Sequence, residues 1–495
     1  MSKTAYSALC ARHVRMYRLS HLHSIASWDQ SANMPAKGNE ARSLALAEMG
    51  GLLHQLATET ELKGLLDAAA QEDLDDVERA NLREMQRAWR ASNALPQSLV
   101  EAKSLANSRC EHAWRSQRPA NDWAGYVENL REVVRLAREE ARCLSAVTGL
   151  APYDALMDQY EPGMRSAEVD RVFGDLRQWL PGLIRDVLEK QSRETVIRPV
   201  PPFAQAAQKA LGHDAMQLMG FDFEAGRLDE SAHPFCGGVP EDVRMTTRYR
   251  EDDFLPSLMG TIHETGHGRY EQNLRRDWLG LPIANARSMG LHESQSLSFE
   301  MQLGSHPGFA GLLRPLVVRH LGDQPAFEVG NLNRLLTRVK PGYIRVDADE
   351  VTYPAHVILR YELERDLMER RIEVADIPEL WDVKMQQWLG LSTNGNYRDG
   401  CMQDIHWTDG SFGYFPSYTL GAMYAAQLRF ALERELGDMG TLVESGRLPE
   451  IFGWLGRHIW SQGSLHGTDE LIRRATGEAL NPQWLRKHLE QRYLK

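Results

Sequence analysis

Residues 262–268 read I-H-E-T-G-H-G, so that His263 and His267 stand four positions apart with Glu264 beside the first. On a helix, positions i and i+4 lie on the same face, and both imidazoles can therefore reach one metal ion. Glu264 then lies about 100° round the helix, close enough to touch water held by that metal without being a ligand. Zinc hydrolases use this H-E-x-x-H arrangement, in which the metal lowers the pKa of its water to about 7 and the glutamate accepts the proton. The segment predicts a zinc-dependent hydrolase.

The third metal ligand must come from another part of the chain. A third histidine six residues after the second is ruled out, because that position is Asn273. The segment 288–300 has helical periodicity and offers Glu293, with His292 beside it as a rival. Glu300 follows Glu293 by seven positions and is expected on the same helix face, where it either orients a ligand or forms a charge pair.

Gly266 and Gly268 lie inside the helix that should carry the two histidines. A glycine in a helix costs about 1 kcal/mol relative to alanine. Glycine is natural, however, where another backbone or a ligand comes close. The two glycines therefore predict a close approach to this helix.

The elements that must position these residues are mostly helices, because apolar residues recur three or four positions apart along most of the chain. β-branched and aromatic residues near Gly and Pro predict short strands at 221–230, 236–250 and 342–346, which we expect to form one small sheet. Helices are expected at 5–26, 40–70, 75–92, 97–116, 122–147, 168–192, 203–218, 253–275, 290–304, 348–371, 378–389, 417–436, 448–461 and 482–493.

No repeat, low-complexity tract or long Gly/Ser/Pro linker divides the chain. The simplest interpretation is a mainly α protein that forms a single catalytic unit over 1–495, with two helical lobes facing a cleft. Its N-terminal part, to about residue 218, should be helical. The small sheet, the zinc site and the C-terminal helices should occupy the remainder, from about residue 219 to 495.

Composition limits the classes of partner. The 495 residues include 57 Lys and Arg against 68 Asp and Glu, a net charge of −11, which excludes nucleic acid or an anionic membrane as the main partner. No run of about 18 apolar residues predicts a membrane span, and the N-terminus has no secretory signal pattern. The 5 cysteines lack a C-x-x-C pair, which favours the reducing cytoplasm. We therefore expect a cytoplasmic protein.

Further short motifs stand in order along the chain. Their order and spacing resemble the carboxypeptidase Taq family of zinc metallocarboxypeptidases, and the resemblance extends over nearly the whole chain. The motifs are W-D-Q with M-P and a later Gly and Arg (Trp28, Asp29, Gln30, Met34, Pro35, Gly38, Arg42), Y-D-A-L-x-D-x-Y-E-P-G-M at 153–164, H-P-F at 233–235, D-x-R-x-T at 242–246, H-E-x-G-H at 263–267, H-E-S-Q-S at 292–296, R-V-x-A-D-E-x-T-Y at 345–353 and G-x-x-Q-D-x-H-W at 400–407.

The resemblance implies a large two-lobed helical zincin with a deep substrate groove and one small β-sheet, similar to the neurolysin and angiotensin-converting-enzyme folds. It implies a cytosolic homodimer that removes single residues from peptide C-termini. By the same resemblance His263, His267 and Glu293 bind one Zn²⁺ per chain, which Co²⁺ can replace, and Glu264 is the general base. Many members read R-L-W-E-N where this chain has Leu-Ser-Phe-Glu-Met at 297–301, a departure that affects substrate preference more than metal binding.

A carboxypeptidase must hold a terminal carboxylate, and an arginine does this better than a lysine because it donates two parallel hydrogen bonds. Arg345, at the end of the strand expected at 342–346, is the first candidate. The competing interpretation is an ion pair of Arg345 with Asp347, Asp349 or Glu350.

Other substrate contacts are less specific. Arg244 and Arg360 are alternative anchors, although Arg244 stands two residues from Asp242 and more plausibly braces the sheet. His233 either faces the cleft or belongs to a turn, since it precedes Pro234.

The stretch 403–421 is a glycine- and aromatic-rich loop that runs into a helix, as cleft-lining segments often do. A tyrosine hydroxyl can stabilise the oxyanion of a tetrahedral intermediate. Tyr418 is the chosen donor because related helical zinc peptidases place a His and a Tyr at similar separation, here His406 and Tyr418; Tyr414 is second. His406 either donates to the substrate backbone or is a structural histidine held by Asp404.

The leading hypothesis is thus a zinc-dependent carboxypeptidase whose partners are peptide substrates. A zinc endo- or oligopeptidase is the alternative enzyme, distinguished by whether a free C-terminus is required. A non-catalytic peptide-binding protein with a structural zinc is the alternative of another class, and it leaves Glu264 without a role.

Overall fold

The computed structural model describes residues 4–231 and 234–495. Most of the first half consists of helices, and α4 and α6 begin at side-chain caps. Asp122, for example, accepts the N–H of Gly125 at the start of α6, and Gly149 ends that helix at φ 73°. The helices of this half are α1 (Thr4–Ala32), α2 (Asn39–Ala57), α3 (Glu61–Ala69), α4 (Asp76–Ala94), α5 (Gln97–Gln117), α6 (Trp123–Thr148), α7 (Pro152–Met157), α8 (Ser166–Ser192) and α9 (Gln205–Leu218).

One small sheet follows α9. It contains β1 (Gly226–Glu230), β2 (Phe235–Val239) and β3 (Asp242–Thr247) in the order β1-β3-β2. β1 pairs parallel to β3, with Leu228 opposite Met245, whereas β2 pairs antiparallel to β3, with Cys236 opposite Met245. β3 and β2 both pack against the next helix, so the sheet supports the helix that carries His263 and His267.

The second half returns to helices, joined by short 3₁₀ turns. Its elements are α10 (Leu255–Gln272), α11 (Met289–Leu297), the π-helical segment η5 (Ser298–Gly304), α12 (Pro307–Leu321), α13 (Val329–Leu336), the 3₁₀ turn η7 (Arg345–Asp347), α14 (Tyr353–Met368), α15 (Ile377–Leu389), α16 (Pro416–Leu436), α17 (Met439–Glu444), α18 (Leu448–His458), α19 (Thr468–Thr476) and α20 (Gln483–Tyr493).

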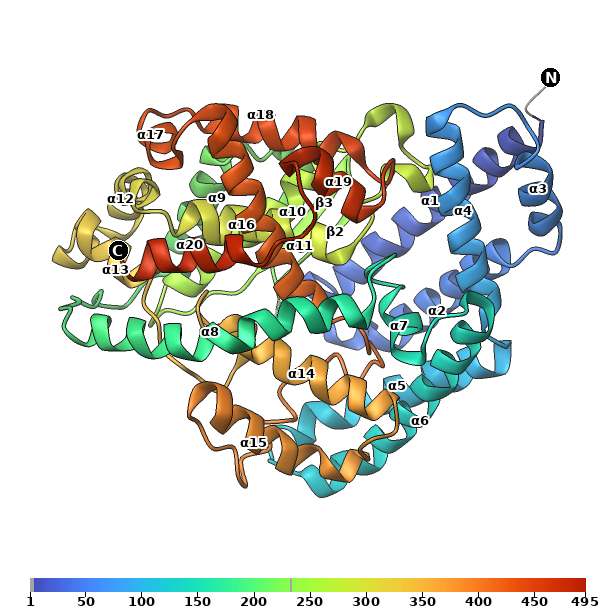
Figure 1. The fold of residues 1–495 in the computed structure, drawn as a ribbon, viewed down its shortest axis with the longest axis horizontal. Helices are drawn as coiled ribbons and strands as arrows, with labels where there is room; N and C mark the ends of the chain where they lie inside the picture. The colour runs from blue at the N-terminus through green and yellow to red at the C-terminus, as the bar shows by residue number, and fades with distance from the viewer. Residues whose placement is uncertain (1–3, 232–233) are drawn as a thin grey trace.

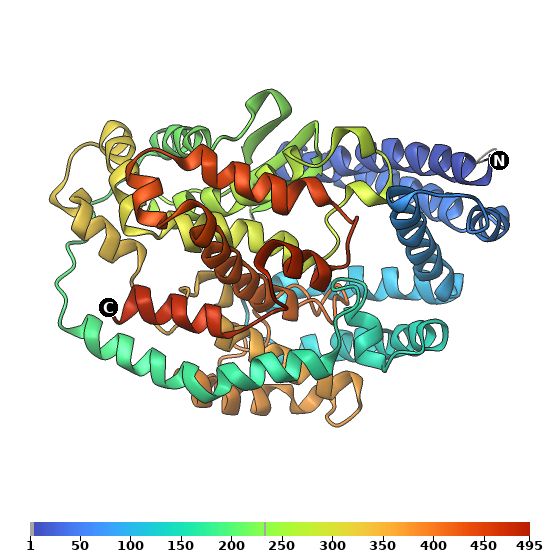
Figure 2. The same ribbon diagram turned by 45° about the horizontal axis from the view of Figure 1, so that its top comes forward.

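The helices are arranged on two sides of the long helix α8. In Figures 1 and 2, α14 and α15 lie on one side, whereas α10, α11 and the red C-terminal helices lie on the other. α1 to α4 form the end of the molecule where the N-terminus lies, and the C-terminus lies toward the opposite end. Among the described helices, none has both the length and the apolar character that a membrane crossing requires.

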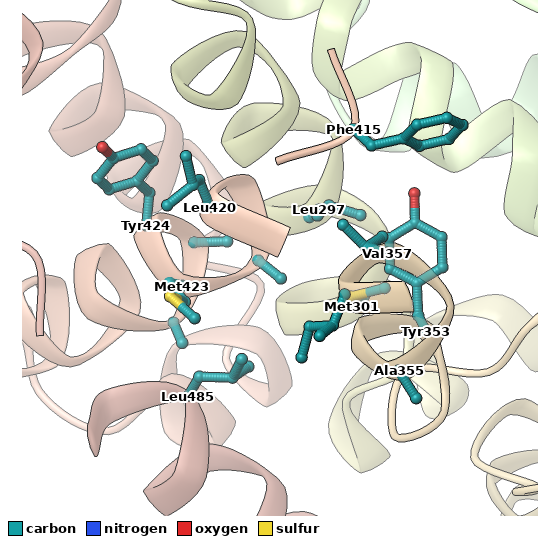
Figure 3. Packing of buried hydrophobic residues seen from close by; sticks show 14 of the residues in the cluster. Leu297, Met301, Tyr353, Ala355, Val357, Phe415, Leu420, Met423, Tyr424 and Leu485 are labelled. Carbon is teal, nitrogen blue, oxygen red and sulfur yellow. The ribbon is translucent and has the colours of Figure 1, made fainter. Parts of the chain in front are cut away.

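The main apolar core joins these parts. It contains buried residues from α5 and α6 through to Tyr493 in α20. Figure 3 shows its centre, where Leu297 of α11, Val357 of α14 and Met423 of α16 gather. Helices α11, α14 and α16 are therefore tightly packed against one another at the centre of the molecule.

Glu350 ties the last helix to the centre of the chain. Its carboxylate accepts hydrogen bonds from Arg492 Nη1 at 3.0 Å and from the hydroxyl of Tyr493 at 2.9 Å, and it contacts His488 Nε2. Arg492 also donates to the backbone oxygen of Met301 in η5. α20 thus holds both the segment before α14 and the segment after α11.

The mainly α class with one small sheet is confirmed, but some expected elements are wrong. The expected strand at 342–346 is absent from the sheet, because the N–H of Arg345 donates to Gln403 Oε1 at 2.8 Å and the chain turns into η7. The helix expected at 40–70 is interrupted at Thr58. The helix expected at 290–304 changes to π geometry at Ser298.

Candidate metal centre and substrate site

The two histidines of the H-E-x-x-H motif lie on α10 and face Glu293 of α11. His267 Nε2 is 3.3 Å and His263 Nε2 is 3.7 Å from Glu293 Oε2. One ligand atom from each of the three residues lies within 4.8 Å of the other two. Within the described part of the chain, these three residues are the group that could hold a metal ion. The geometry brings together the three ligands that the resemblance implies.

The helices carrying these ligands touch at glycines. A Cβ on Gly266 of α10 would lie 2.4 Å from Gln295 O and 2.6 Å from the Cα of Ser296 in α11. A Cβ on Gly421 of α16 would lie 2.7 Å from Cγ of Glu293. The close approach expected at Gly266 is therefore a helix crossing, and it sets the distance between the histidines and Glu293.

Further side chains hold the two imidazoles by their other nitrogen. His263 Nδ1 lies 2.7 Å from Glu300 Oε2, as expected for a residue that orients a ligand. His267 Nδ1 lies 2.6 Å from His292 Nδ1, and His292 Nε2 lies 2.8 Å from Glu271 Oε1. Both ring nitrogens of His292 face other groups, whereas Glu293 Oε2 faces the Nε2 atoms of both histidines, so the geometry favours Glu293 over His292.

The charge of the centre suits a divalent cation. Burial would raise the pKa of Glu293, but the two facing imidazoles lower it to about 2, so this carboxylate is charged. Burial would lower the pKa of His263, but Glu293 and then Glu300 raise it to about 10. The carboxylates of Glu293 and Glu300 thus place negative charge beside the imidazoles, and the donor set of two nitrogens and one oxygen is that of catalytic zinc sites.

Glu264 lies buried beside the first histidine of the motif. Its side chain is buried, and its Oε2 has no hydrogen-bond partner. Burial raises the pKa of Glu264 to about 7. A carboxyl group with such a pKa can both accept and return a proton near neutral pH.

A second cluster surrounds Arg345. Arg345 Nε donates to Asp404 Oδ1 at 2.9 Å, and its Nη1 lies 3.4 Å from the hydroxyl of Tyr353. Its guanidinium carbon lies 4.6 Å from the ring centroid of Tyr418. Arg360 Nε binds the other oxygen of Asp404 at 2.6 Å. The ion-pair partner of Arg345 is therefore Asp404. It is none of the three acids expected from the sequence, which were Asp347, Asp349 and Glu350.

This cluster carries excess positive charge. Arg345 and Arg360 share the single carboxylate of Asp404, whose pKa they hold well below its usual range against the effect of burial. Burial, helped by Arg345, lowers the pKa of His406 to about 3. Burial also lowers the pKa of His356 to about 3. Both histidines are therefore neutral at pH 7, and they add no charge to the cluster.

His406, Tyr414 and Tyr418 meet beside Arg345. His406 Nε2 lies 2.9 Å from the hydroxyl of Tyr418, and the ring centroids of Tyr414 and Tyr418 are 5.2 Å apart. Burial raises the pKa of Tyr418 to about 12, and the Glu293 carboxylate adds to the rise. Gly421, three residues after Tyr418 on α16, touches Glu293, and this contact places Tyr418 near the three residues that could hold a metal ion. Asp404, considered as a support for His406, binds the two arginines instead.

Arg244 lies apart from this cluster. Its Nε donates to Asp242 Oδ1 at 2.5 Å, and its guanidinium carbon lies 4.5 Å from the ring centroid of Trp28 in α1. These contacts brace the sheet against α1, as the spacing of Arg244 and Asp242 suggested; a direct substrate contact of Arg244 stays a prediction. His233 lies outside the described residues.

Sequence reasoning did not assign Tyr353 or Glu271 to the site. Tyr353 ends the R-V-x-A-D-E-x-T-Y motif and could have been chosen on that ground. Glu271 follows His267 by four positions on the same helix, which is a signal for a shared face. The contact of Glu271 with His267 through His292 depends on how α10 and α11 cross, which the sequence does not reveal.

A helix with H-E-x-x-H and a glutamate from the next helix, in a mainly helical fold, define a metallopeptidase. A family model for carboxypeptidase Taq (M32) metallopeptidases matches residues 8–493. Thermostable carboxypeptidase 1 of Thermus thermophilus is 38% identical over 491 residues, covering 96% of this chain and 95% of that protein. The solved structure of Trypanosoma cruzi metallocarboxypeptidase 1 is 46% identical, with a TM-score of 0.98 over 100% of both chains.

The solved structure of Pyrococcus furiosus carboxypeptidase is 32% identical, with a TM-score of 0.93 over 100% of this chain and 99% of that one. The chain belongs to the carboxypeptidase Taq (M32) family of metallopeptidases. It is a metallocarboxypeptidase, a hydrolase that cleaves peptide bonds at C-termini, and the family implies zinc as its metal.

Proposed function

We propose that this metallocarboxypeptidase holds one Zn²⁺ per chain on His263, His267 and Glu293 and anchors the C-terminal carboxylate of its peptide substrate on Arg345. The excess positive charge of the Arg345 cluster carries the proposal. The cluster lies beside Tyr418 of α16, the helix that touches Glu293 at Gly421. A buried cation without a full set of counter-charges is costly. A substrate carboxylate supplies the missing charge.

A zinc ion bound by His263, His267 and Glu293 would supply a Lewis acid for the attacked carbonyl and for the attacking water. The chain's own residues then move the proton. Glu264, whose Oε2 is buried without a partner, accepts the proton of the water and returns it to the leaving nitrogen. Glu300 and His292 keep the two histidine ligands in place.

Tyr418 is proposed to stabilise the oxyanion. With its proton on Nε2, neutral His406 donates to the oxygen of Tyr418 at 2.9 Å, and this tautomer leaves the phenol O–H available for the developing negative charge. Tyr414 and Tyr353 pack around Tyr418, with ring centroids 5.2 and 6.1 Å away. They limit water access and hold the phenol beside Arg345.

Broader assignments rest on the family resemblance. The protein is proposed to form a homodimer and to act in the cytoplasm. Its native metal is proposed to be zinc, which cobalt can replace, and residues 1–495 are proposed to form one catalytic unit. The free state of Cys10, Cys110, Cys143, Cys236 and Cys401 supports the cytoplasm. Light scattering of the purified protein tests the dimer.

The test is mass-spectrometric digestion of one peptide and its C-terminal amide, with and without a chelator. We expect stepwise loss of single C-terminal residues from the free acid, abolished by chelation and strongly reduced by amidation. Arg345→Ala leaves Asp404 paired with Arg360 and should slow the free acid roughly 10- to 150-fold, because a charged hydrogen bond contributes about 1.5–3 kcal/mol. The amide should change far less.

Each other outcome contradicts part of the proposal. Internal cuts in both peptides would indicate an oligopeptidase. Bound zinc without cleavage would indicate a peptide-binding protein. An equal loss on both substrates in Arg345→Ala would make Arg345 structural.

A further inference from the structure

The two histidine ligands are held in different ways. His263 faces the carboxylate of Glu300 directly, at 2.7 Å. His267 instead faces another imidazole, that of His292, which in turn faces Glu271 at 2.8 Å. We propose that His292 and Glu271 are positioning residues that fix the proton of His267 on Nδ1 and so keep its Nε2 lone pair on the metal. The inference rests on the proposed zinc site.

His267, His292 and Glu271 form a relay of contacting side chains. The positions of the protons along this relay follow from the metal site. A neutral histidine that offers Nε2 to a metal carries its proton on Nδ1. That Nδ1–H of His267 can only donate, so Nδ1 of His292, 2.6 Å away, must accept. His292 then carries its own proton on Nε2, which donates to Glu271. Only this order of protons satisfies both contacts and leaves Nε2 of His267 free for zinc.

The relay also joins the two helices that provide the ligands. His267 and Glu271 lie one turn apart on α10, and His292 lies on α11 next to Glu293. The rings of His267 and His292 are 4.6 Å apart and inclined at 33°, and the ring of Tyr270 lies 5.4 Å from that of His292. The side chains of His267, His292 and Glu271 are 15%, 18% and 26% exposed, so water competes little for the inner contact.

A relay ending in a carboxylate should strengthen zinc binding. The Glu271 charge favours donation from His292, which makes Nδ1 of His292 a better acceptor and His267 a more basic ligand. Loss of such an outer partner typically weakens metal affinity 10- to 100-fold. The effect should appear in zinc retention before any substrate is present.

The experiment measures the rate at which zinc leaves the holoenzyme into excess chelator. His292→Ala should raise this rate roughly 10- to 100-fold. His292→Asn, which keeps an acceptor beside His267 but does not reach Glu271, should fall between His292→Ala and the native protein. Glu271→Gln should give a smaller rise, because it removes only the charge.

A double variant tests whether the relay acts as a unit. Glu271→Ala should have almost no further effect once His292 is alanine, since its influence passes through that ring. Independent, additive effects of the two changes would overturn the proposal. Thermal unfolding of the metal-free variants should match that of the native metal-free protein, a result that a merely structural role would not give.

The matched control is His320→Ala. His320 Nε2 lies 2.8 Å from Asp214 Oδ2, with side-chain exposures of 18% and 26%, the same values as in the His292–Glu271 pair. His320→Ala should leave the rate of zinc release from the holoenzyme unchanged.

Native zinc retention in both His292→Ala and Glu271→Gln would reject the relay while leaving the zinc site intact. Equal zinc content in His267→Ala and native protein would instead reject the proposed metal site itself.

Discussion

Glu264 differs from the other carboxylates of the metal centre in having no hydrogen-bond donor on its Oε2. Glu293 and Glu300 each face an imidazole, whereas Glu264 is kept buried beside them. An unpaired buried carboxyl group lowers stability, and such groups are expected where chemistry requires them. The isolation of Glu264 fits a role in proton transfer.

Glu264→Gln should lower kcat by roughly 10²–10⁴-fold, because the amide has the same shape but does not accept the proton. Zinc content and the affinity for a substrate should stay near native values, since Glu264 is not a ligand. Single-turnover kinetics with metal analysis checks this. Native turnover would contradict the proposed base.

Tyr418→Phe should lower kcat by roughly 10²–10³-fold with little change in KM, the usual effect of losing one oxyanion donor. The phenyl ring remains, so the face that lies 4.6 Å from the Arg345 guanidinium carbon is kept. Steady-state kinetics separates the two parameters. A rise in KM alone would assign Tyr418 to substrate binding instead.

At the scale of elements, the site depends on how closely three helices approach. α11 touches α10 at Gly266 and α16 at Gly421, so that the ligand-bearing helix is fixed from two sides. Gly266 meets backbone atoms of α11, and Gly421 meets the Cβ and Cγ of Glu293 itself, none of which can move aside as the end of a flexible side chain could. A small change in either contact should therefore move Glu293 relative to the histidines.

Gly266→Ala should destabilise the protein by about 1–3 kcal/mol, the range for overpacking, and should weaken zinc binding. Its Cβ would meet backbone atoms of Gln295 and Ser296. Gly260→Ala in the same helix is the control, since nothing lies within 4 Å of its Cβ. This second change should stabilise by about 0.5–1 kcal/mol. Unfolding and zinc titrations of both variants provide the comparison, and similar results would contradict the close-contact argument.

Local patterns predicted the elements well, and long-range contacts explain most of the errors. The i, i+4 spacing of His263 and His267 needs only a helix, so it could be found from residues alone. The choice of Glu293 over His292 needed the family resemblance, because the crossing of α10 and α11 decides it. Arg345 was placed on a strand because the sequence does not show that its N–H pairs with Gln403.

Some helices were not predicted because they are short or apolar on several sides. α13 and α17 span only Val329–Leu336 and Met439–Glu444, too few residues for a clear period. The π segment at Ser298 was missed because its sequence continues the helical pattern. The π segment contributes to the site because it contains Glu300, whose carboxylate faces His263.

At the scale of the whole molecule, Glu350 joins the middle of the chain to its last helix. Burial would raise the pKa of Glu350, but His488 and Arg492 lower it to about 2. The folded carboxylate thus keeps its charge to lower pH than an unfolded glutamate, whose ordinary pKa is 4.5. Its contribution to stability is present above pH 4.5 and is lost as the pH falls toward 2.

Glu350→Gln should destabilise the protein by roughly 3 kcal/mol at pH 7, because it leaves the buried guanidinium of Arg492 without its counter-charge. The difference in Tm between native and variant should shrink as the pH falls below 4.5. Unfolding of metal-free protein at several pH values tests this. Glu490→Gln, which breaks the surface pair with Arg486 in the same helix, is the control and should change stability by less than about 1 kcal/mol. A constant difference between pH 7 and pH 3 would contradict the assignment.

α20 also bears on the metal centre, although it contributes no ligand. Tyr493 of α20 is 4% exposed and donates to Glu350, and Arg492 of the same helix donates to the backbone oxygen of Met301 in η5. Met301 follows Glu300, whose carboxylate faces His263. Fraying of α20 should therefore loosen the hold on His263, so that zinc retention depends on the docking of a helix far from the ligands in sequence.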